Sequence, residues 1–542
     1  MTFQKNKLFA DAIVCLVLTV MFAALIFPVL NTPFSVGDDH RIIAMNAPEK
    51  MEAAYKKSLF DQTPNLAGSV LIDAQIGRFR PMGWLITKTQ CVLFGDNYFS
   101  WRVWNLFILF FSVLFLSLII GKLGGKGLGK LAILAVYVFG RNNETWWTLI
   151  PPAQNIGELF LLAGFYHWLR YRENNTAKEK YFALVLFLFS ALVKESFIFC
   201  LPFVGLMDFL FINPQKKLFT REYKQGFIVF IIPFAILLSI ILFSKKIYGY
   251  PYEQGIFSIL GYNAWQFFFS SVFLLAPVTM FFYRNHVITR RSLVKIFILT
   301  LSWFLVQLIL LKSIRMDDQH HYLVPGLLLV LVLSALSIQN IKQRSTIVSN
   351  VLVLLYFSFA IWQAKNTFVN SGYYSAQVKS FYKMTAEIKK TSPGIIVYMS
   401  HSPFAGDWLM GTSAILRNSG INSPICFSSL ADSIPKWQKE FLKSRPQMKF
   451  QQLHPLELGF RSSDMEQILQ KGDWIVFPDF LSKNEENPPQ VGVEKYEGSN
   501  NYDYLRTKPK HFSTSYYDFS ISKILKGNFS RSSVGYCAIQ IE

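Results

Sequence analysis

The feature that most constrains this chain is a series of apolar segments, each near 20 residues long, that recurs along its first two thirds. A helix of about 20 apolar residues crosses the roughly 30 Å hydrocarbon core of a bilayer. Charged residues make up 16% of the chain, whereas soluble proteins carry about 25%. These features predict a polytopic α-helical membrane protein.

The apolar segments and their polar flanks predict about eleven membrane spans. Lysines precede the first segment, as in a signal peptide, but no small-residue cleavage site follows it, so we expect a retained helix. Lys194 and Glu195 separate the fifth span from the sixth. The predicted spans are residues 8–30, 99–120, 128–142, 153–169, 181–194, 196–212, 226–244, 265–283, 293–312, 321–339 and 346–363.

Basic residues determine the predicted orientation of these spans. They gather in alternate loops, for example at Lys122, Lys126 and Lys130, and such clusters mark the cytoplasmic side. This placement accounts for the net charge of +20, and no nucleic-acid motif accompanies it, so we expect no nucleic-acid partner. We expect a bacterial inner or plasma membrane, a cytoplasmic N-terminus, and residues 31–98 and those after about 365 on the outer face.

Beyond residue 365 the apolar segments shorten to the length of β-strands. Amphipathic stretches at 376–390 and 434–443 separate them, and this alternation predicts an α/β fold. The expected strands lie at 395–399, 474–477 and 537–541. No Gly-x-Gly-x-x-Gly follows the first strand, so a dinucleotide site is not expected.

The sequence therefore predicts two domains. Residues 1–364 would form the membrane module, with 31–98 as its first large outer loop, and residues 365–542 would form an extracytoplasmic α/β domain. Cys426 and Cys537 both fall in the second domain, and the sequence leaves open whether they form a disulfide.

An acidic pair, Asp38 and Asp39, lies a few residues beyond the first span, in the sequence GDDH. A solvated loop or a helix cap is the simpler explanation of such a pair. Alternatively, a carboxylate at this position could remove a proton from an acceptor hydroxyl, and partial burial would make it a better base. A divalent cation bound by the two carboxylates is a further option, although the sequence requires no cofactor.

Other ionisable residues lie against span ends on the same outer face. Arg78 and Arg80 precede a proline and an aromatic stretch that predicts an interfacial helix, and arginine either binds phosphate oxygens or snorkels to lipid headgroups. Charges such as Lys194 and Glu195 inside an apolar stretch cost about 2.5–3.5 kcal/mol each, so they should pair or face a polar cavity. The remaining candidates on this face are Arg315 for phosphate, and His40, Glu144, His320, His321 and Tyr322 for substrate.

The order of these motifs resembles the GT-C superfamily of integral-membrane glycosyltransferases, and within it the protein O-mannosyltransferase and lipid A aminoarabinose transferase group. GDDH at 37–40 resembles that group's acidic motif after the first span, and RPMGWL at 80–85 is similar to its lipid-phosphate segment. ALVKESFIFCLP resembles a recurring Lys-Glu segment, and HYLVP at 321–325 resembles an Arg-Tyr-Leu-Leu-Pro pattern. Arg80 stands where lysine is usual, and His321 where arginine is common.

The resemblance implies an inverting transfer of a sugar from a polyprenyl-phosphate donor to an extracytoplasmic glycan, lipid or protein. Asp38 would be the general base, and Asp39 would position the acceptor or bind a metal ion. Glu195 is a further candidate substrate contact. The lipid phosphate would be bound by Arg78, Arg80, Lys194 and Arg315.

Two other classes of function remain as alternatives. A transporter or flippase of a lipid-linked glycan would share the cationic site, but such proteins usually contain an internal repeat, and none is evident in the sequence. A non-catalytic scaffold that displays the outer domain would leave Lys194, Glu195 and Arg315 unexplained.

Overall fold

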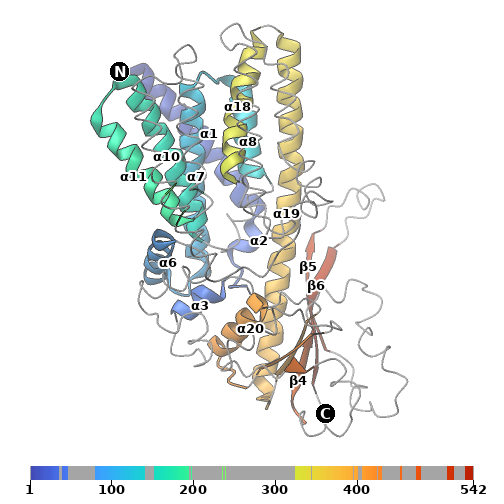
Figure 1. Cartoon of the computed structure of the whole chain (residues 1–542). Helices are drawn as coiled ribbons and strands as arrows, with labels where there is room; N and C mark the ends of the chain where they lie inside the picture. Colours follow the sequence, from blue (N-terminus) through green and yellow to red (C-terminus); the bar gives the residue numbers. More distant parts are fainter. Residues whose placement is uncertain are drawn as a thin grey trace. The chain divides into compact units, whose positions relative to one another are not determined.

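The computed structural model describes residues 2–35, 39–46, 80–140, 152–194, 197, 235, 239, 324–343, 345–394, 396–400, 406–423, 425–429, 452–453, 471–477, 510–517 and 531–540. Contacts within the chain define two compact units (Figure 1). Unit 1 comprises Met1–Phe27, Ser69–Thr89 and Trp101–Phe368, and unit 2 comprises Pro28–Gly68, Gln90–Ser100 and Val369–Glu542.

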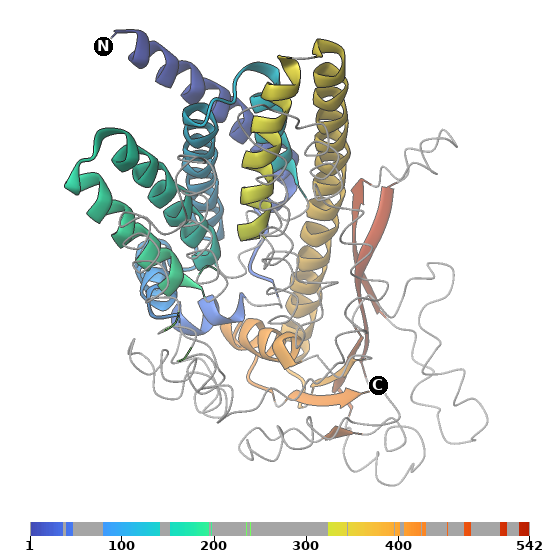
Figure 2. The same cartoon turned by 45° about the horizontal axis from the view of Figure 1, so that its top comes forward.

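Unit 1 is built from apolar helices. Helices α10 and α11 pack against each other, and α8 packs against α18 and α1. Figure 2 shows α7 beside this α10–α11 pair. Asn175, with φ of 51°, lies in the left-handed region and turns the chain from α10 into α11. The helices are α1 (Thr2–Leu25), α6 (Pro81–Phe94), α7 (Tyr98–Lys122), α8 (Gly127–Phe139), α10 (Pro152–Asn174), α11 (Ala177–Val193), α18 (Val324–Lys342) and α19 (Thr346–Thr391), of which α6, α7 and α19 also extend into unit 2.

Three of the described helices are long and apolar enough to cross a membrane. They are Leu8–Leu25 within α1, Tyr98–Lys122 and Thr346–Thr391, while Gly127–Phe139 is a shorter apolar helix. This finding agrees with the predicted helical membrane protein. The predicted spans from 196–212 to 293–312 lie outside the described residues apart from Phe197, Ala235 and Ser239, so the count of eleven stays a prediction.

Small residues allow close helix packing in unit 1. A Cβ atom added at Gly157 of α10 would lie 2.7 Å from the ring of Phe197, and one at Gly164 would lie 2.9 Å from the ring of Phe187. Association of helices in a bilayer depends on such close approach because lipid is as apolar as the side chains. The two glycines therefore account for the tight pairing of α10 with the chain around α11.

A turn at Ile26 separates the first apolar helix from the short helix α2 (Phe27–Leu30), which contains Pro28. Pro28 has no N–H to donate to the preceding turn, and the helical pattern is interrupted at Ile26. This break directs the chain into the segment that carries the acidic pair, which the structure places in unit 2 from Pro28 onward.

Unit 2 contains a six-stranded sheet with strand order β3-β2-β1-β4-β6-β5. Strands β3, β2, β1 and β4 are parallel, and β6 pairs antiparallel with both β4 and β5. Helix α20 lies between β1 and β2 in the chain and packs against α3. The elements are α3 (His40–Asn46), β1 (Ile396–Ser400), α20 (Gly406–Asn418), β2 (Ile425–Ser429), β3 (Gln452–Leu453), β4 (Trp474–Phe477), β5 (Lys510–Tyr517) and β6 (Arg531–Gln540).

The expected strands correspond closely to β1, β4 and the end of β6. The sheet topology bears on the two cysteines through the backbone alone. Cys426 lies on β2 and Cys537 on β6, with β1 and β4 between them. Three strand spacings, roughly 14 Å, separate these two strands. A disulfide needs a Cα separation below about 7 Å.

The second half of α19 packs on the strand pair β5–β6. The ring of Phe381 meets Tyr536 edge to face at 5.1 Å, and Tyr373 meets Tyr516 at 5.5 Å. The Ser380 hydroxyl lies 2.9 Å from both the Thr514 hydroxyl and the Val534 carbonyl. Aromatic and hydroxyl contacts together fix this helix to the sheet.

Arg417 secures the end of α20 in the same unit. Its guanidinium donates to the carbonyls of Ile421 and Ser423 at 2.6 and 2.8 Å. Burial lowers the pKa of the Arg417 guanidinium. These bonds satisfy carbonyls just beyond the helix C-terminus, so we interpret Arg417 as a structural residue.

Substitution of Gly535 on β6 is expected to disrupt the sheet. A Cβ atom there would lie 1.9 Å from the Phe512 carbonyl oxygen, so the β5 backbone would have to move. We expect Gly535→Ala to cost about 3 kcal/mol, measured as a fall in the unfolding midpoint in detergent. Gly372→Ala is the matched control because its Cβ would meet Tyr516 at an ordinary 3.5 Å. Equal midpoints for the two variants would contradict the packing described.

Candidate functional site

The acidic pair lies in residues 31–39, which we call the acidic loop and which join α2 to α3. Asp38 lies outside the described residues, whereas Asp39 is fully buried. One carboxylate oxygen of Asp39 accepts the Ser35 backbone N–H at 2.7 Å. Its carbonyl accepts the N–H groups of Ile42 and Ile43 at 3.0 and 3.2 Å. Asp39 therefore closes the loop on itself and begins α3.

Helix α19 contacts the acidic loop and α2 within unit 2. The Tyr374 hydroxyl lies 3.4 Å from the same Asp39 oxygen that accepts the Ser35 N–H. The Ser375 hydroxyl lies 2.7 Å from both the Thr32 hydroxyl and the Pro28 carbonyl. Thr32 and Ser375 are both buried, so these bonds are shielded from water. No sequence signal predicted these contacts, because about 340 residues separate the partners.

Arg80 precedes α6 and belongs to unit 1. Pro81 begins the helix, a position where its missing N–H is not needed, and the Arg80 carbonyl accepts the Trp84 N–H at 3.1 Å. The predicted helix after Arg80 is thus present. The Arg80 side chain is 8% exposed, as expected of a cation used inside the protein rather than in solvent. Arg78 lies outside the described residues.

Lys194 terminates α11, where its backbone becomes extended (φ −154°, ψ 137°). This break agrees with the predicted boundary between the fifth and sixth spans. The Lys194 ammonium donates to the Gln154 side-chain oxygen on α10, and both side chains are buried. The printed partner of the Lys194 side chain is therefore a neutral amide on α10. Glu195 lies outside the described residues.

A second buried polar group, which the sequence did not indicate, lies one helical turn along α10. The Tyr137 hydroxyl of α8 donates to the Glu158 carboxyl at 2.7 Å, and both side chains are at most 2% exposed. Asn155 is also buried, and Ser190 of α11 donates to the Gly157 carbonyl at 2.7 Å. The available signal was a lone glutamate within a predicted span, a position where ionisable residues are costly and usually functional.

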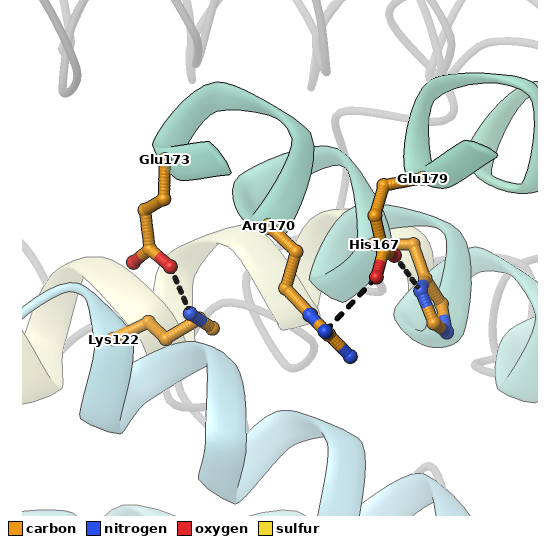
Figure 3. Close-up of polar contacts among 5 residues, drawn as sticks. All are labelled: Lys122, His167, Arg170, Glu173 and Glu179. Carbon is orange, nitrogen blue, oxygen red and sulfur yellow. Dashed lines mark hydrogen bonds and ion pairs between the residues drawn. The ribbon is translucent and has the colours of Figure 1, made fainter. Parts of the chain in front are cut away.

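Ion pairs occupy the opposite end of the α10–α11 hairpin (Figure 3). Glu179 bonds His167 at 2.5 Å and Arg170 at 3.1 Å, and Lys122 pairs with Glu173. His167 lies near the end of the predicted span 153–169. Its partner is a carboxylate beside an arginine, which is the arrangement of a structural ion-pair network joining α7, α10 and α11.

The other predicted site residues lie outside the described part of the chain. They are Glu144, Arg315, His320, His321 and Tyr322, and for His40 the structure describes the backbone in α3 but no side chain. Within the described residues, no group of three or more His, Cys, Asp or Glu side chains is arranged to hold a metal ion. A divalent cation at the acidic pair stays a sequence-based option.

The described residues include a buried carboxylate in unit 2, Asp39, and two buried cations in unit 1, Arg80 and Lys194. No protein-family model matches the chain, and comparison with curated proteins found no match. The described helices support a helical membrane protein with buried ionisable residues, and its function is a proposal.

The Tyr137–Glu158 bond is expected to stabilise unit 1. Tyr137→Phe would keep the ring and leave the Glu158 carboxyl without its hydroxyl donor, which should cost about 1–2 kcal/mol. Unfolding in mixed micelles would measure this loss. Tyr171→Phe on the same bundle is the control, since its ring lies near Lys180 and that contact needs no hydroxyl. Unchanged stability of Tyr137→Phe would show that the bond is not made.

Proposed function

We propose that this protein is a GT-C-like glycosyltransferase that moves a sugar from a polyprenyl monophosphate to an extracytoplasmic acceptor. The observation that carries the proposal is the buried Asp39 carboxylate, which accepts the Ser35 N–H within the acidic loop. Burial of a carboxylate is costly unless it is hydrogen-bonded, and this one is bonded within its own loop. Its neighbour Asp38 shares the GDDH motif that resembles the catalytic motif of this superfamily.

In the proposed reaction, Asp38 removes the proton of the acceptor hydroxyl. The acceptor oxygen then attacks the anomeric carbon opposite the phosphate, and the bond from that carbon to the phosphate oxygen breaks with inversion through an oxocarbenium-like state. Arg80 and Lys194 bind the phosphate and stabilise the charge that develops on it. Asp39 holds the loop, since one of its oxygens already accepts the Ser35 N–H.

The proposal includes more membrane spans than the three candidates among the described helices, together with their orientation. Positive residues in alternate loops support about eleven spans with the N-terminus in the cytoplasm. The strands and α20 of unit 2 support an α/β domain over residues 365–542, which we place outside the membrane together with the acidic loop. Cysteine-accessibility labelling of the intact cell would test this orientation at residues of β5 and of the α10–α11 turn.

Donor consumption by the purified protein tests the proposed activity. The probes are undecaprenyl-phosphate-linked mannose, glucose, arabinose and aminoarabinose, incubated in detergent with the full chain. We expect one of them to yield free or transferred sugar and undecaprenyl phosphate, detected by mass spectrometry. Failure to cleave any of the four, with or without added envelope extract as the acceptor, would contradict the proposal.

A flippase of a lipid-linked glycan is the alternative function. Gln154, which accepts from Lys194, and the buried Glu158 lie one turn apart on α10 and would suit a path for a charged headgroup. The two functions differ in their need for a membrane. A flippase leaves the donor chemically intact and acts only across a bilayer, so cleavage in detergent separates them. Movement of intact donor across proteoliposomes without cleavage would favour the flippase.

A further inference from the structure

The acidic loop belongs to the same compact unit as the part of α19 from Val369 onward, which packs on the sheet. We infer that Tyr374 and Ser375 on α19 are positioning residues that set the conformation of the acidic loop, and thereby the orientation of Asp38. The inference rests on the proposed function for its catalytic meaning, whereas its structural part is independent of it. If the inference holds, α19 contributes positioning residues to the proposed site.

The first contact that supports this inference is a triangle of buried oxygens. Thr32, Ser375 and the Pro28 carbonyl lie 2.7–2.8 Å from one another. Two hydroxyl hydrogens serve these three contacts, so at most two hydrogen bonds form at once. Without the Ser375 hydroxyl, Thr32 can still donate to Pro28, but the contacts that Ser375 makes with Thr32 and Pro28 are lost.

The second contact is made at Asp39 itself. Its Oδ2 accepts the Ser35 N–H at 2.7 Å and lies 3.4 Å from the Tyr374 hydroxyl. A carboxylate oxygen has two lone pairs and can accept both donors. Asp39, the residue next to Asp38 in the chain, is thus bonded to the start of its own loop and to α19.

The third observation is that the same segment of α19 is fixed to the sheet. Tyr373 packs on Tyr516 of β5, and Ser380 lies 2.9 Å from Thr514. Residues 373 and 380 are seven apart and share one helix face, while 374 and 375 are turned by about 100° and 200° from 373. One side of the helix therefore contacts the strands while another contacts the loop, and α20 packs on α3 as a second link.

Hydrogen–deuterium exchange of the full chain in detergent, read at the amides of residues 29–35 and 39–46, tests the structural part. We expect exchange there to accelerate about five- to tenfold in Tyr374→Phe and Ser375→Ala, because each change removes hydroxyl bonds and little volume. The control is Ser349→Ala, whose hydroxyl donates to the Ile338 carbonyl of α18 at 3.3 Å. This variant should leave exchange of the loop unchanged.

Kinetics with the donor that the wild-type protein cleaves tests the catalytic part. A misaligned base slows chemistry without weakening donor binding, so kcat should fall about tenfold in Tyr374→Phe while KM for the donor stays constant. Wild-type loop exchange in both variants would overturn the inference, as would full kcat in a variant whose loop exchanges faster. If no donor is cleaved by the wild type, the proposed function fails and the exchange experiment still decides whether α19 holds the loop.

Discussion

Asp38→Asn is expected to reduce donor-dependent turnover by about 100- to 10,000-fold, because the amide cannot accept the acceptor's proton. Asp39→Asn should reduce it by less than about tenfold, since the Asn oxygen can still accept the Ser35 N–H that closes the loop. The contrast assigns proton removal to Asp38 and positioning to Asp39. Steady-state release of undecaprenyl phosphate by the purified variants measures both effects.

Asp96→Asn is the matched control for these two variants. Asp96 is an exposed aspartate of unit 2 that accepts a 3.1 Å bond from the side-chain amide of Asn46, and an Asn oxygen can accept the same bond. We expect wild-type turnover from it. Full activity in both Asp38→Asn and Asp39→Asn, in protein that elutes as the wild type does, would remove the acidic pair from the mechanism.

Lys194→Met is expected to reduce turnover by about 100-fold, the effect of removing one group that stabilises charge developing in the transition state. Methionine has a similar length and no charge, so packing at the end of α11 is largely kept. The loss should appear in kcat as well as in KM if Lys194 stabilises the leaving phosphate, and in KM alone if it only binds the donor. Initial rates over a range of donor concentrations distinguish these results.

The control for Lys194→Met is Lys130→Met. Lys130 is also largely buried and paired, with Asp11 at 2.8 Å, but it lies at the start of α8 rather than at the end of α11. Its loss should leave both kinetic constants unchanged. An equal loss of activity in the two variants would mean that both substitutions act by destabilising the protein. The assignment of Lys194 to the phosphate would then be abandoned.

Helix α19 shows which part of the fold could be predicted from the sequence. The apolar run at 346–363 correctly predicted a membrane-type helix, and the amphipathic run at 376–390 was predicted to belong to the next domain. In the structure both lie in one helix, Thr346–Thr391. Hydropathy marks where a helix leaves lipid, but a helix continues until its backbone is interrupted, and the lone Gly372 does not interrupt this one.

In the candidate site, some buried polar residues could be predicted from the sequence and others could not. Arg80 and Lys194 were predicted because charges beside apolar runs are visible in a sequence, and both are buried. Tyr137 could not be predicted, since a tyrosine in an apolar segment is ordinary until its hydroxyl is seen 2.7 Å from Glu158. Tyr374 and Ser375 are more extreme examples, because their contacts depend on how residues far apart in the chain are brought together.

Comparative mass spectrometry of envelope glycans, lipids and proteins tests the central claim most directly. The native host would be compared with a deletion strain and with strains that carry the wild-type chain or Asp38→Asn. We predict that the deletion and Asp38→Asn strains lack a single hexose, pentose or amino sugar from one envelope component, and that the wild-type chain restores it. Identical envelope spectra in all four strains would contradict the claim that this protein transfers a sugar.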